Sequence, residues 1–456
     1  MGPIVSEPRR ASAIFAVLAL ALAPGIARAT GAAASAVAPL RFGDAVKSAA
    51  QSTPAVVVAS DRVAEAQARV GQARAALLPT IGGSALSTER TFNLESFGIE
   101  FPVPPGATPL PALQGPVGLV DARVKATQTL LDISSIRHTR AAGHDLRASA
   151  SDRDQVAEQA ARAAALAYLR AARAQAVADA RASDARIARV LLTLAAAQRR
   201  AGIAPSIDET RARTAVATAL GESLIAVNEA SLARIDLART LGISPAAPPL
   251  LADTLSDDLG ASTVPSDAGA ILPFALHHRP ELAAEEARLA KVNAEHAAIS
   301  SERIPRLDAV ADWGVSGQQW ADAFTTYEYG LALSWPLFDG LRRESRLSEQ
   351  AAKQRESEVR RHDLADQVEA EVQGALLDLA SGSERLVIAE QRLSLALQEL
   401  LEARDRFVNG VAGNIEIITA QASLVRARDA EIEARFTVAS ARVALAGAAG
   451  VAQSLH

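Results

Sequence analysis

The hydrophobic period of the chain changes from two to seven within one stretch, from Thr326 to about Val411. Up to Trp335, apolar and aromatic residues alternate with small or polar ones, which predicts a strand with one apolar face. After Gly340, apolar residues recur every seven positions, which predicts a coiled-coil helix. Roughly 68 residues at ~1.5 Å each span about 100 Å, so this helix needs equally long helices as partners. The recurring positions are Val372, Leu379, Leu386, Leu393, Leu400 and Phe407.

The same order of elements occurs twice in the sequence. Leu130-Leu131-Asp132 matches Leu337-Phe338-Asp339 at a spacing of 207 residues, and Gly202 to Asp208 matches Gly410 to Glu416 at a spacing of 208. Each half is therefore expected to contain a helix, two strands, a very long helix, a tight turn and a returning helix.

An amino-terminal targeting pattern and the repeat divide the chain into four segments. Arg9 and Arg10 precede an apolar run at 13–23 and a small-residue site at 27–29, which predicts a cleaved signal peptide. The alternative is a membrane anchor, but an apolar run of about eleven residues falls short of the ~20 that span a bilayer. The predicted segments are the signal peptide at 1–29, the first repeat at 30–241, a Pro/Ser/Asp-rich linker at 242–275 and the second repeat at 276–456.

Four strands are predicted, near 80–92, 117–130, 307–316 and 326–335, and in the second, third and fourth the charged residues fall on one face only. Two interpretations are open. The strands form either a soluble sheet with one buried face or part of an outer-membrane barrel, with apolar residues toward lipid and charges toward water. Aromatic residues favour the barrel, because they gather in the second strand pair as in a membrane interface. They are Trp313, Tyr327, Tyr329 and Trp335.

A barrel would require more than one copy of the chain. Four strands cannot close alone, and open strand edges are not tolerated in lipid. Two copies would give eight strands, a barrel ordinarily filled by side chains, whereas three copies would give twelve and could hold water. A conducting pore therefore implies at least a trimer.

Composition excludes several other classes of site. The chain has no cysteine, which excludes disulfides, thiolate metal sites and a lipid-modified amino-terminal cysteine. Without residues 1–29 it keeps 44 basic and 51 acidic residues, a net charge of −7, which disfavours nucleic-acid binding. The histidine pair His277-His278 lacks carboxylates at ligand spacing, and no catalytic motif or cofactor fingerprint occurs. We therefore expect no metal, no cofactor and no enzymatic activity.

Four motifs of the sequence together resemble those of the TolC-like outer membrane efflux proteins. They are the duplicated Leu337-Phe338-Asp339-Gly340 motif, the Arg279-Pro280-Glu281-Leu282 opening of the second half, Leu77-Leu78-Pro79 and the turn at 407–416. The resemblance covers nearly the whole chain after the signal peptide. It implies a mixed, mainly α fold: a trimeric channel-tunnel with a twelve-stranded β-barrel in the outer membrane of a Gram-negative bacterium and a long periplasmic α-helical barrel. It also implies a membrane-fusion adaptor protein and an inner-membrane pump as partners.

The resemblance assigns the periplasmic tip of the tunnel to the two tight turns, which would dock the adaptor. Asp208 and Glu416 fall in the first turn of the returning helices, where an acid is favoured by the helix dipole and where the family places rings of acidic residues. Phe407 and Ala412 stand where the best-known member has a tyrosine and an arginine, so packing of Phe407 could replace ion pairs in closing the aperture. The predicted docking turns are Gly202, Ile203 and Ala204 in the first repeat and Gly410, Val411 and Ala412 in the second.

The predicted function is a passive outer-membrane exit duct that opens when an adaptor docks and performs no chemistry. Multidrug efflux, metal efflux and type I protein secretion share such a duct, and the sequence does not choose among them. The alternative is a secreted or periplasmic coiled-coil structural protein that binds partners through its long helices and has no pore.

Overall fold

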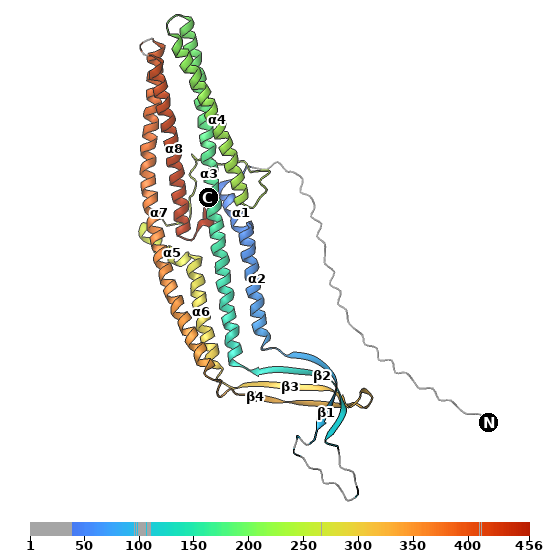
Figure 1. Ribbon diagram of the computed structural model, residues 1–456. Helices are drawn as coiled ribbons and strands as arrows, with labels where there is room; N and C mark the ends of the chain where they lie inside the picture. Colours follow the sequence, from blue (N-terminus) through green and yellow to red (C-terminus); the bar gives the residue numbers. More distant parts are fainter. Residues whose placement is uncertain are drawn as a thin grey trace, which may run out of the picture. The chain divides into compact units, whose positions relative to one another are not determined.

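The computed structural model describes residues 39–94, 96, 98, 106, 111–265, 267–409, 411 and 413–456 (Figure 1). The predicted signal peptide at 1–29 and the turn residues Gly410 and Ala412 lie outside the described residues. The predicted boundaries between repeats and linker stay predictions, although one helix, α5, begins inside the predicted linker at 242–275.

Eight α-helices are present in the described part of the chain, and they include the two very long helices that the heptad pattern predicts. The predicted length is confirmed, because α3 has 68 residues and α7 has 67. None of the helices searched combines the length and apolar character needed to cross a membrane. The helices are α1 (Phe42–Ser52), α2 (Pro54–Ala75), α3 (Ile133–Arg200), α4 (Ser206–Thr240), α5 (Ala268–His278), α6 (Pro280–Ser301), α7 (Arg342–Val408) and α8 (Asn414–Ala448), with short 3-10 turns at Trp320–Asp322 and Ala452–Ser454.

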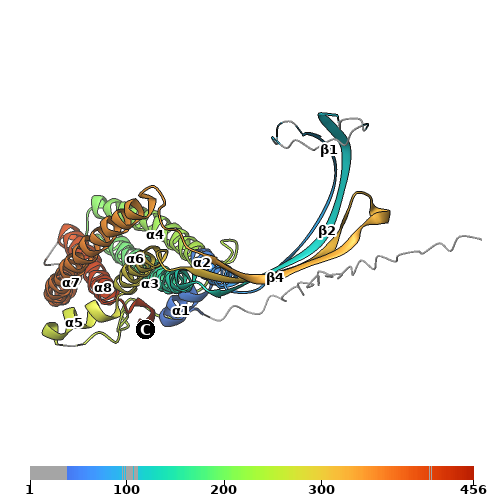
Figure 2. The ribbon, with the colours of Figure 1, turned by 90° about the horizontal axis from the view of Figure 1, so that it is seen from below.

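The four predicted strands form one antiparallel sheet in the order β1-β2-β3-β4 (Figure 2). The strands are β1 (Thr80–Asn93), β2 (Leu113–Leu131), β3 (Arg306–Gly317) and β4 (Phe324–Ser334). Each strand turns back beside its neighbour, and β2 and β3, which come from different repeats, pair in the middle of the sheet. The outer edges of β1 and β4 carry no further strand among the described residues. The sheet therefore joins the two repeats and leaves one open edge on each.

The long helices form two antiparallel hairpins, α3 with α4 and α7 with α8, and α3 also packs against α8 (Figure 1). The first and last residues of the predicted heptad series, Val372 and Phe407, are buried in the helix packing, but the four leucines between them are only half-buried. Small residues three places after each heptad position are buried along α7, and their size lets the helices approach closely. These residues are Ala375, Gly382, Ala389, Ala396 and Ala403.

Charged side chains cross the seam between the two hairpins. Asp184 on α3 is buried and lies 2.5 Å from an arginine nitrogen of Arg428 on α8, and Arg181 lies 2.8 Å from Asp429. Burial raises the pKa of Asp184, although Arg428 and Arg181 oppose that shift. The seam is therefore held by paired charges as well as by apolar contacts.

The largest apolar cluster lies where the helices meet the chain ends. Phe42 packs edge to face on Tyr168 at a ring distance of 5.5 Å, and the Tyr168 hydroxyl donates to the Leu40 carbonyl at 2.8 Å. Leu40 also forms an isolated parallel β-bridge with Leu251, which lies in the segment between the repeats. These contacts fasten the start of the described chain to that segment.

Candidate functional site

The tip of the first hairpin is a turn that satisfies the last carbonyl groups of α3. Gly202 has a φ of +74° and its N–H donates to the Arg199 carbonyl, while Ile203 donates to the Gln198 carbonyl, each at 3.0 Å. This pair of bonds is the Schellman motif, for which glycine is favoured because it adopts positive φ without strain. Ile203 is 69% exposed and Ala204 is half-buried. The turn therefore presents one branched apolar side chain at its surface.

The tip of the second hairpin repeats this geometry in its described residues. Val411 N–H donates to the Arg406 carbonyl at 2.9 Å, the bond that corresponds to Ile203 with Gln198. Val411 is also 69% exposed. The two tips thus present equivalent apolar side chains, from residues that are 208 positions apart in the sequence.

Two hydrogen bonds tie the tips to each other. Asn414 at the start of α8 is buried and its side-chain amide donates to the Asp208 carbonyl at 2.9 Å. The Gln198 amide donates to the Phe407 carbonyl at 3.0 Å. Because each bond runs from one hairpin to the other, a change in the angle between the hairpins must break both.

The acidic residues at the two tips lie in different surroundings. Asp208 is buried, with its carboxylate 3.8 Å from Arg211 on the same helix. Glu416 is half-buried, with a side chain that is 41% exposed, and it pairs with Arg406 at 3.1 Å. Glu209, which follows Asp208, accepts from Arg199 at 2.6 Å and also pairs with Arg213. The hydrogen bond from Arg199 is the main reason that the pKa of Glu209 lies below its ordinary value.

Phe407 lies inside the second hairpin and is buried. It belongs to an apolar cluster with Ala403 on α7, Leu191 on α3, and Ile417 and Ala420 on α8. Its ring therefore stabilises the packing of three helices within the chain.

The sheet separates apolar from charged side chains as the alternation predicts. On one face Val124 lies opposite Trp313, and Trp313 opposite Tyr327. On the other face Lys125 lies opposite Asp312, and Asp312 opposite Glu328. The four aromatic residues predicted for a membrane interface are all exposed. Trp313, Tyr327 and Tyr329 lie in the strands, and Trp335 lies just past the end of β4.

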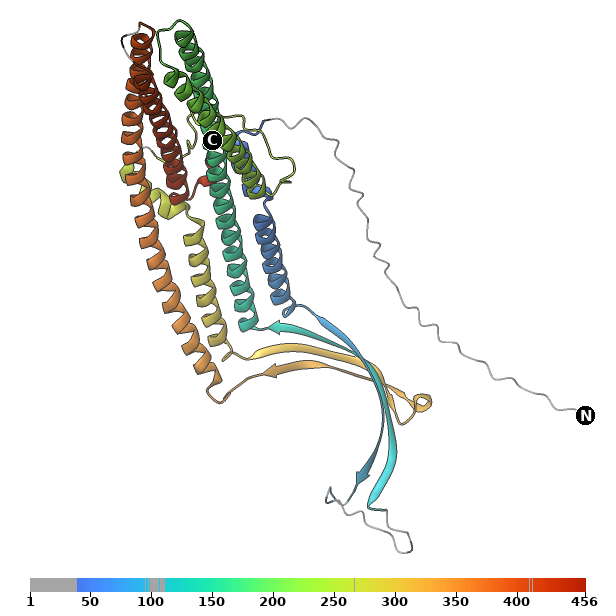
Figure 3. The same ribbon diagram turned by 45° about the horizontal axis from the view of Figure 1, so that its top comes forward.

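The strand-to-helix junctions of the two repeats differ. In the first, Asp132 caps α3 by accepting from the Ser135 N–H at 2.9 Å. In the second, Gly340 and Leu341 both have positive φ, of +71° and +66°, and α7 begins only at Arg342 (Figure 3). The matched Asp132 and Asp339 therefore act in different backbone geometries.

A family profile described as Outer membrane efflux protein matches residues 45–243 and 271–451. The two matched segments cover both sequence repeats, including both hairpins and all four strands. The chain belongs to the outer membrane efflux protein family. No curated protein sequence matches it.

Several solved structures of outer membrane channels are similar to this member of the family. CmeC of Campylobacter jejuni has a TM-score of 0.74 at 14% identity, covering 90% of this chain and 86% of its own. VceC of Vibrio cholerae has a TM-score of 0.70 at 20% identity, covering 90% and 96%. MtrE of Neisseria gonorrhoeae, in its open state, has a TM-score of 0.73 at 18% identity, covering 90% and 89%. At these identities the likeness establishes the fold.

Family membership confirms the predicted fold class and the location in the outer membrane. The chain is an outer membrane efflux protein, and its structural neighbours are outer membrane channels. No group of histidine, cysteine and acidic residues suited to a metal ion occurs among the described residues.

The structure brings together more of the tip than sequence reasoning found. It places Asp208, Phe407 and Glu416 near the tips, but it also adds Glu209 with Arg199 and buried Asn414. Glu209 could have been found, because it stands next to Asp208 in the first turn of a helix and lies ten positions after Arg199, across a tight turn. The contact of Asn414 with a backbone carbonyl has no sequence signal.

Proposed function

We propose that the efflux protein is a passive exit duct formed by three copies of the chain. The observation that carries this proposal is that, among the described residues, the sheet and the helical layer are each left without a neighbouring element on both sides. Strands β1 and β4 end the sheet, and helices α4 and α7 end the helical layer, because α3 and α8 pack between them. A chain with two different open sides closes into a ring by head-to-tail contacts.

The outer helices carry the apolar surface that such contacts require. Along α4, Leu224 and Ile225 are exposed, and along α7, Leu377 and Leu395 are exposed. Further exposed apolar residues of these two helices are Ile207, Leu220, Val227, Leu232, Val387, Ile388 and Leu401. Exposed apolar surface of this extent on long helices favours burial against another helix.

Three copies would supply twelve strands, a closed barrel wide enough for water. The charged face with Asp312 and Lys125 would line the aqueous interior, and the face with Trp313 and Tyr327 would contact lipid. Cargo would cross by diffusion, and the energy for transport would come from an inner-membrane pump.

The tips would dock a periplasmic adaptor protein. Ile203 and Val411 support this role, because they are exposed apolar side chains on tight turns and can be covered by another helical hairpin. Gly202, Ala204, Gly410 and Ala412 complete the proposed docking turns. Among the acids, the side chain of Glu416 is 41% exposed and fits a ring at the aperture, whereas Asp208 is buried beside Arg211. Phe407 would act on the aperture by fixing the second hairpin.

Conductance across a planar lipid bilayer tests the proposal. Mature protein purified in detergent, with its mass determined in detergent, should be a trimer that gives discrete and long-lived current steps. A protein that stays in solution without detergent and gives no current would overturn the duct and favour a coiled-coil scaffold.

A further inference from the structure

Four large apolar side chains are exposed together between β4 and α7. Trp335 is 58% exposed, Leu337 76%, Phe338 80% and Leu341 61%. We call these four residues the junction patch. They follow Leu331 and Leu333, whose side chains are exposed on β4, so the patch continues an apolar surface of the sheet toward the helices.

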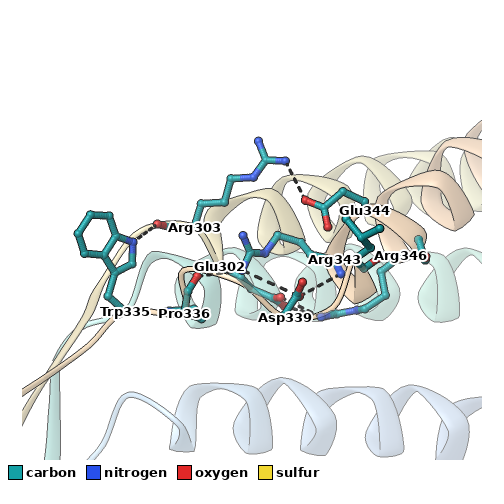
Figure 4. Close-up of polar contacts among 10 residues, drawn as sticks. Glu302, Arg303, Trp335, Pro336, Asp339, Arg343, Glu344 and Arg346 are labelled. Carbon is teal, nitrogen blue, oxygen red and sulfur yellow. Dashed lines mark hydrogen bonds and ion pairs between the residues drawn. The ribbon is translucent and has the colours of Figure 1, made fainter.

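The backbone of the junction patch is fixed by hydrogen bonds on its polar side (Figure 4). The Asp339 carboxylate accepts from the Arg343 N–H at 3.0 Å, and the Arg343 guanidinium donates to the Pro336 carbonyl at 3.3 Å. The Trp335 indole donates to the Arg303 carbonyl at 3.1 Å. Leu341 is held at a φ of +66°, a conformation that is unfavourable for leucine. The contacts thus hold a strained residue with its side chain exposed, as occurs at functional sites.

An unpaired arginine stands beside the junction patch. Arg342 is exposed and makes no hydrogen bond or ion pair within the described part of the chain. It lies in the first turn of α7, where the helix dipole disfavours a cation. The matching residue of the first repeat, 207 positions earlier, is Ser135, which is bonded to Asp132. The second junction therefore leaves a positive charge that an anion from outside the chain would balance.

We propose that the junction patch and Arg342 bind the phospholipid leaflet that faces the periplasm, with Arg342 on a lipid phosphate. This rests on the proposed membrane-spanning duct. An indole, aliphatic side chains and an arginine side by side are typical of a membrane interface, where the apolar parts enter the acyl region and the cation stays among the headgroups. The patch continues the lipid-facing side of the sheet, which favours lipid over a second copy of the chain as occupant, and a lipid phosphate supplies the anion that Arg342 lacks.

Quenching by brominated phospholipids tests the contact with native Trp335. The protein has three tryptophans, so the variant W313F/W320F leaves Trp335 alone. Reconstituted in vesicles of phosphatidylethanolamine and phosphatidylglycerol, this variant should be quenched by bromines near the headgroup end of the acyl chain more than by deeper ones. Quenching by aqueous iodide alone would overturn the proposal.

A matched pair of tryptophan probes separates lipid from protein as the occupant. In a background with all three tryptophans replaced by phenylalanine, F338W should be quenched by bromolipid and V359W should not. Val359 is 68% exposed and lies on α7, about 26 Å beyond the start of that helix. If bromolipid and iodide both leave F338W unquenched, a second copy of the chain covers the junction patch and the proposal is wrong.

The role of Arg342 is tested by the affinity of the detergent-solubilised protein for phosphatidylglycerol. Native mass spectrometry should show that R342Q weakens binding by about fivefold, the usual effect of one basic residue near an anionic lipid surface. The control is R361Q, because Arg361 is also exposed on α7 and makes no ion pair among the described residues. Equal affinities of R342Q and R361Q would remove Arg342 from the proposal. A conducting trimer with an unquenched junction patch would refute this inference alone, whereas loss of conductance would refute the duct.

Discussion

The two hairpin tips have the same turn geometry but stabilise it with opposite chemistry. In the first tip, Arg199 and Glu209 form an ion pair across the turn. At the matching positions of the second tip, 208 residues later, Phe407 and Ile417 pack in an apolar cluster. The exposed Ile203 and Val411 are alike. The two repeats have therefore kept the exposed apolar residue of the turn, while the interaction behind each turn differs.

This difference gives the tips unequal resistance to opening. A buried aromatic ring contributes several kcal/mol, whereas an ion pair with one exposed partner contributes little and is weakened by salt and by acid. We therefore expect the first tip to be the more easily altered of the two.

The largest effect is expected from F407A. Removing the buried ring should lower the local free energy of opening of the second tip by about 3–5 kcal/mol, because a cavity is left among α3, α7 and α8. Amide hydrogen exchange near Leu191 and Ala420 measures this value. The matched change R199A in the first tip is the control and should have a much smaller effect. Equal effects would contradict the comparison.

A smaller effect is expected from N414A, which removes a bond between the hairpins. The Asp208 carbonyl would lose its donor from Asn414 but would keep its helical hydrogen bond within α4, so the loss should be about 0.5–1.5 kcal/mol, the net value of one hydrogen bond. Exchange should increase at both tips, since the bond joins them. The variant N409A serves as a control, because the Asn409 amide bonds only within its own turn. Faster exchange at the second tip alone would show that the tips open independently.

The ion pair of the first tip should make its stability depend on pH. The folded state lowers the pKa of Glu209, so the stabilisation is present above the ordinary glutamate pKa and is lost as the pH falls through the lowered value. Amide exchange around Ile203 should therefore differ between wild type and E209Q at about pH 6 and converge at about pH 3. The amides around Val411 should respond to E209Q at neither pH. A difference that persists in acid would contradict the assignment.

The smallest effect on stability is expected from E416Q. Its ion pair with Arg406 is exposed at both ends, so the loss should be about 0.2–1 kcal/mol. The clearer measurement is the reversal potential of the reconstituted pore in a salt gradient, which should shift toward zero if an acidic ring favours cations. D208N is the comparison, and its smaller shift is expected because Asp208 is buried.

The elements of the fold could be predicted because they depend on local periodicity. The heptads of α7 end at Phe407 and the alternation of β4 ends at Trp335, close to the observed boundaries. The tip could be predicted only in part. The alanines buried between the helices cannot be told from the other alanines of an alanine-rich sequence. The hydrogen bond of Asn414 to Asp208 depends on which hairpins are neighbours in space.

The seam inside the first hairpin bears on the width of the proposed tunnel. In the two clusters that join the middle of α3 to α4, the buried side chains are all alanine, whereas Leu424 enters the seam of α7 and α8. Helix axes joined by alanine lie at the short end of the ordinary 8–10 Å range. In the proposed tunnel, the spacing between neighbouring helices would set the circumference. The alanines would therefore restrict its bore, and larger residues in the same seam would widen it. The α3/α4 seam residues are Ala178, Ala185, Ala188, Ala219, Ala226 and Ala230.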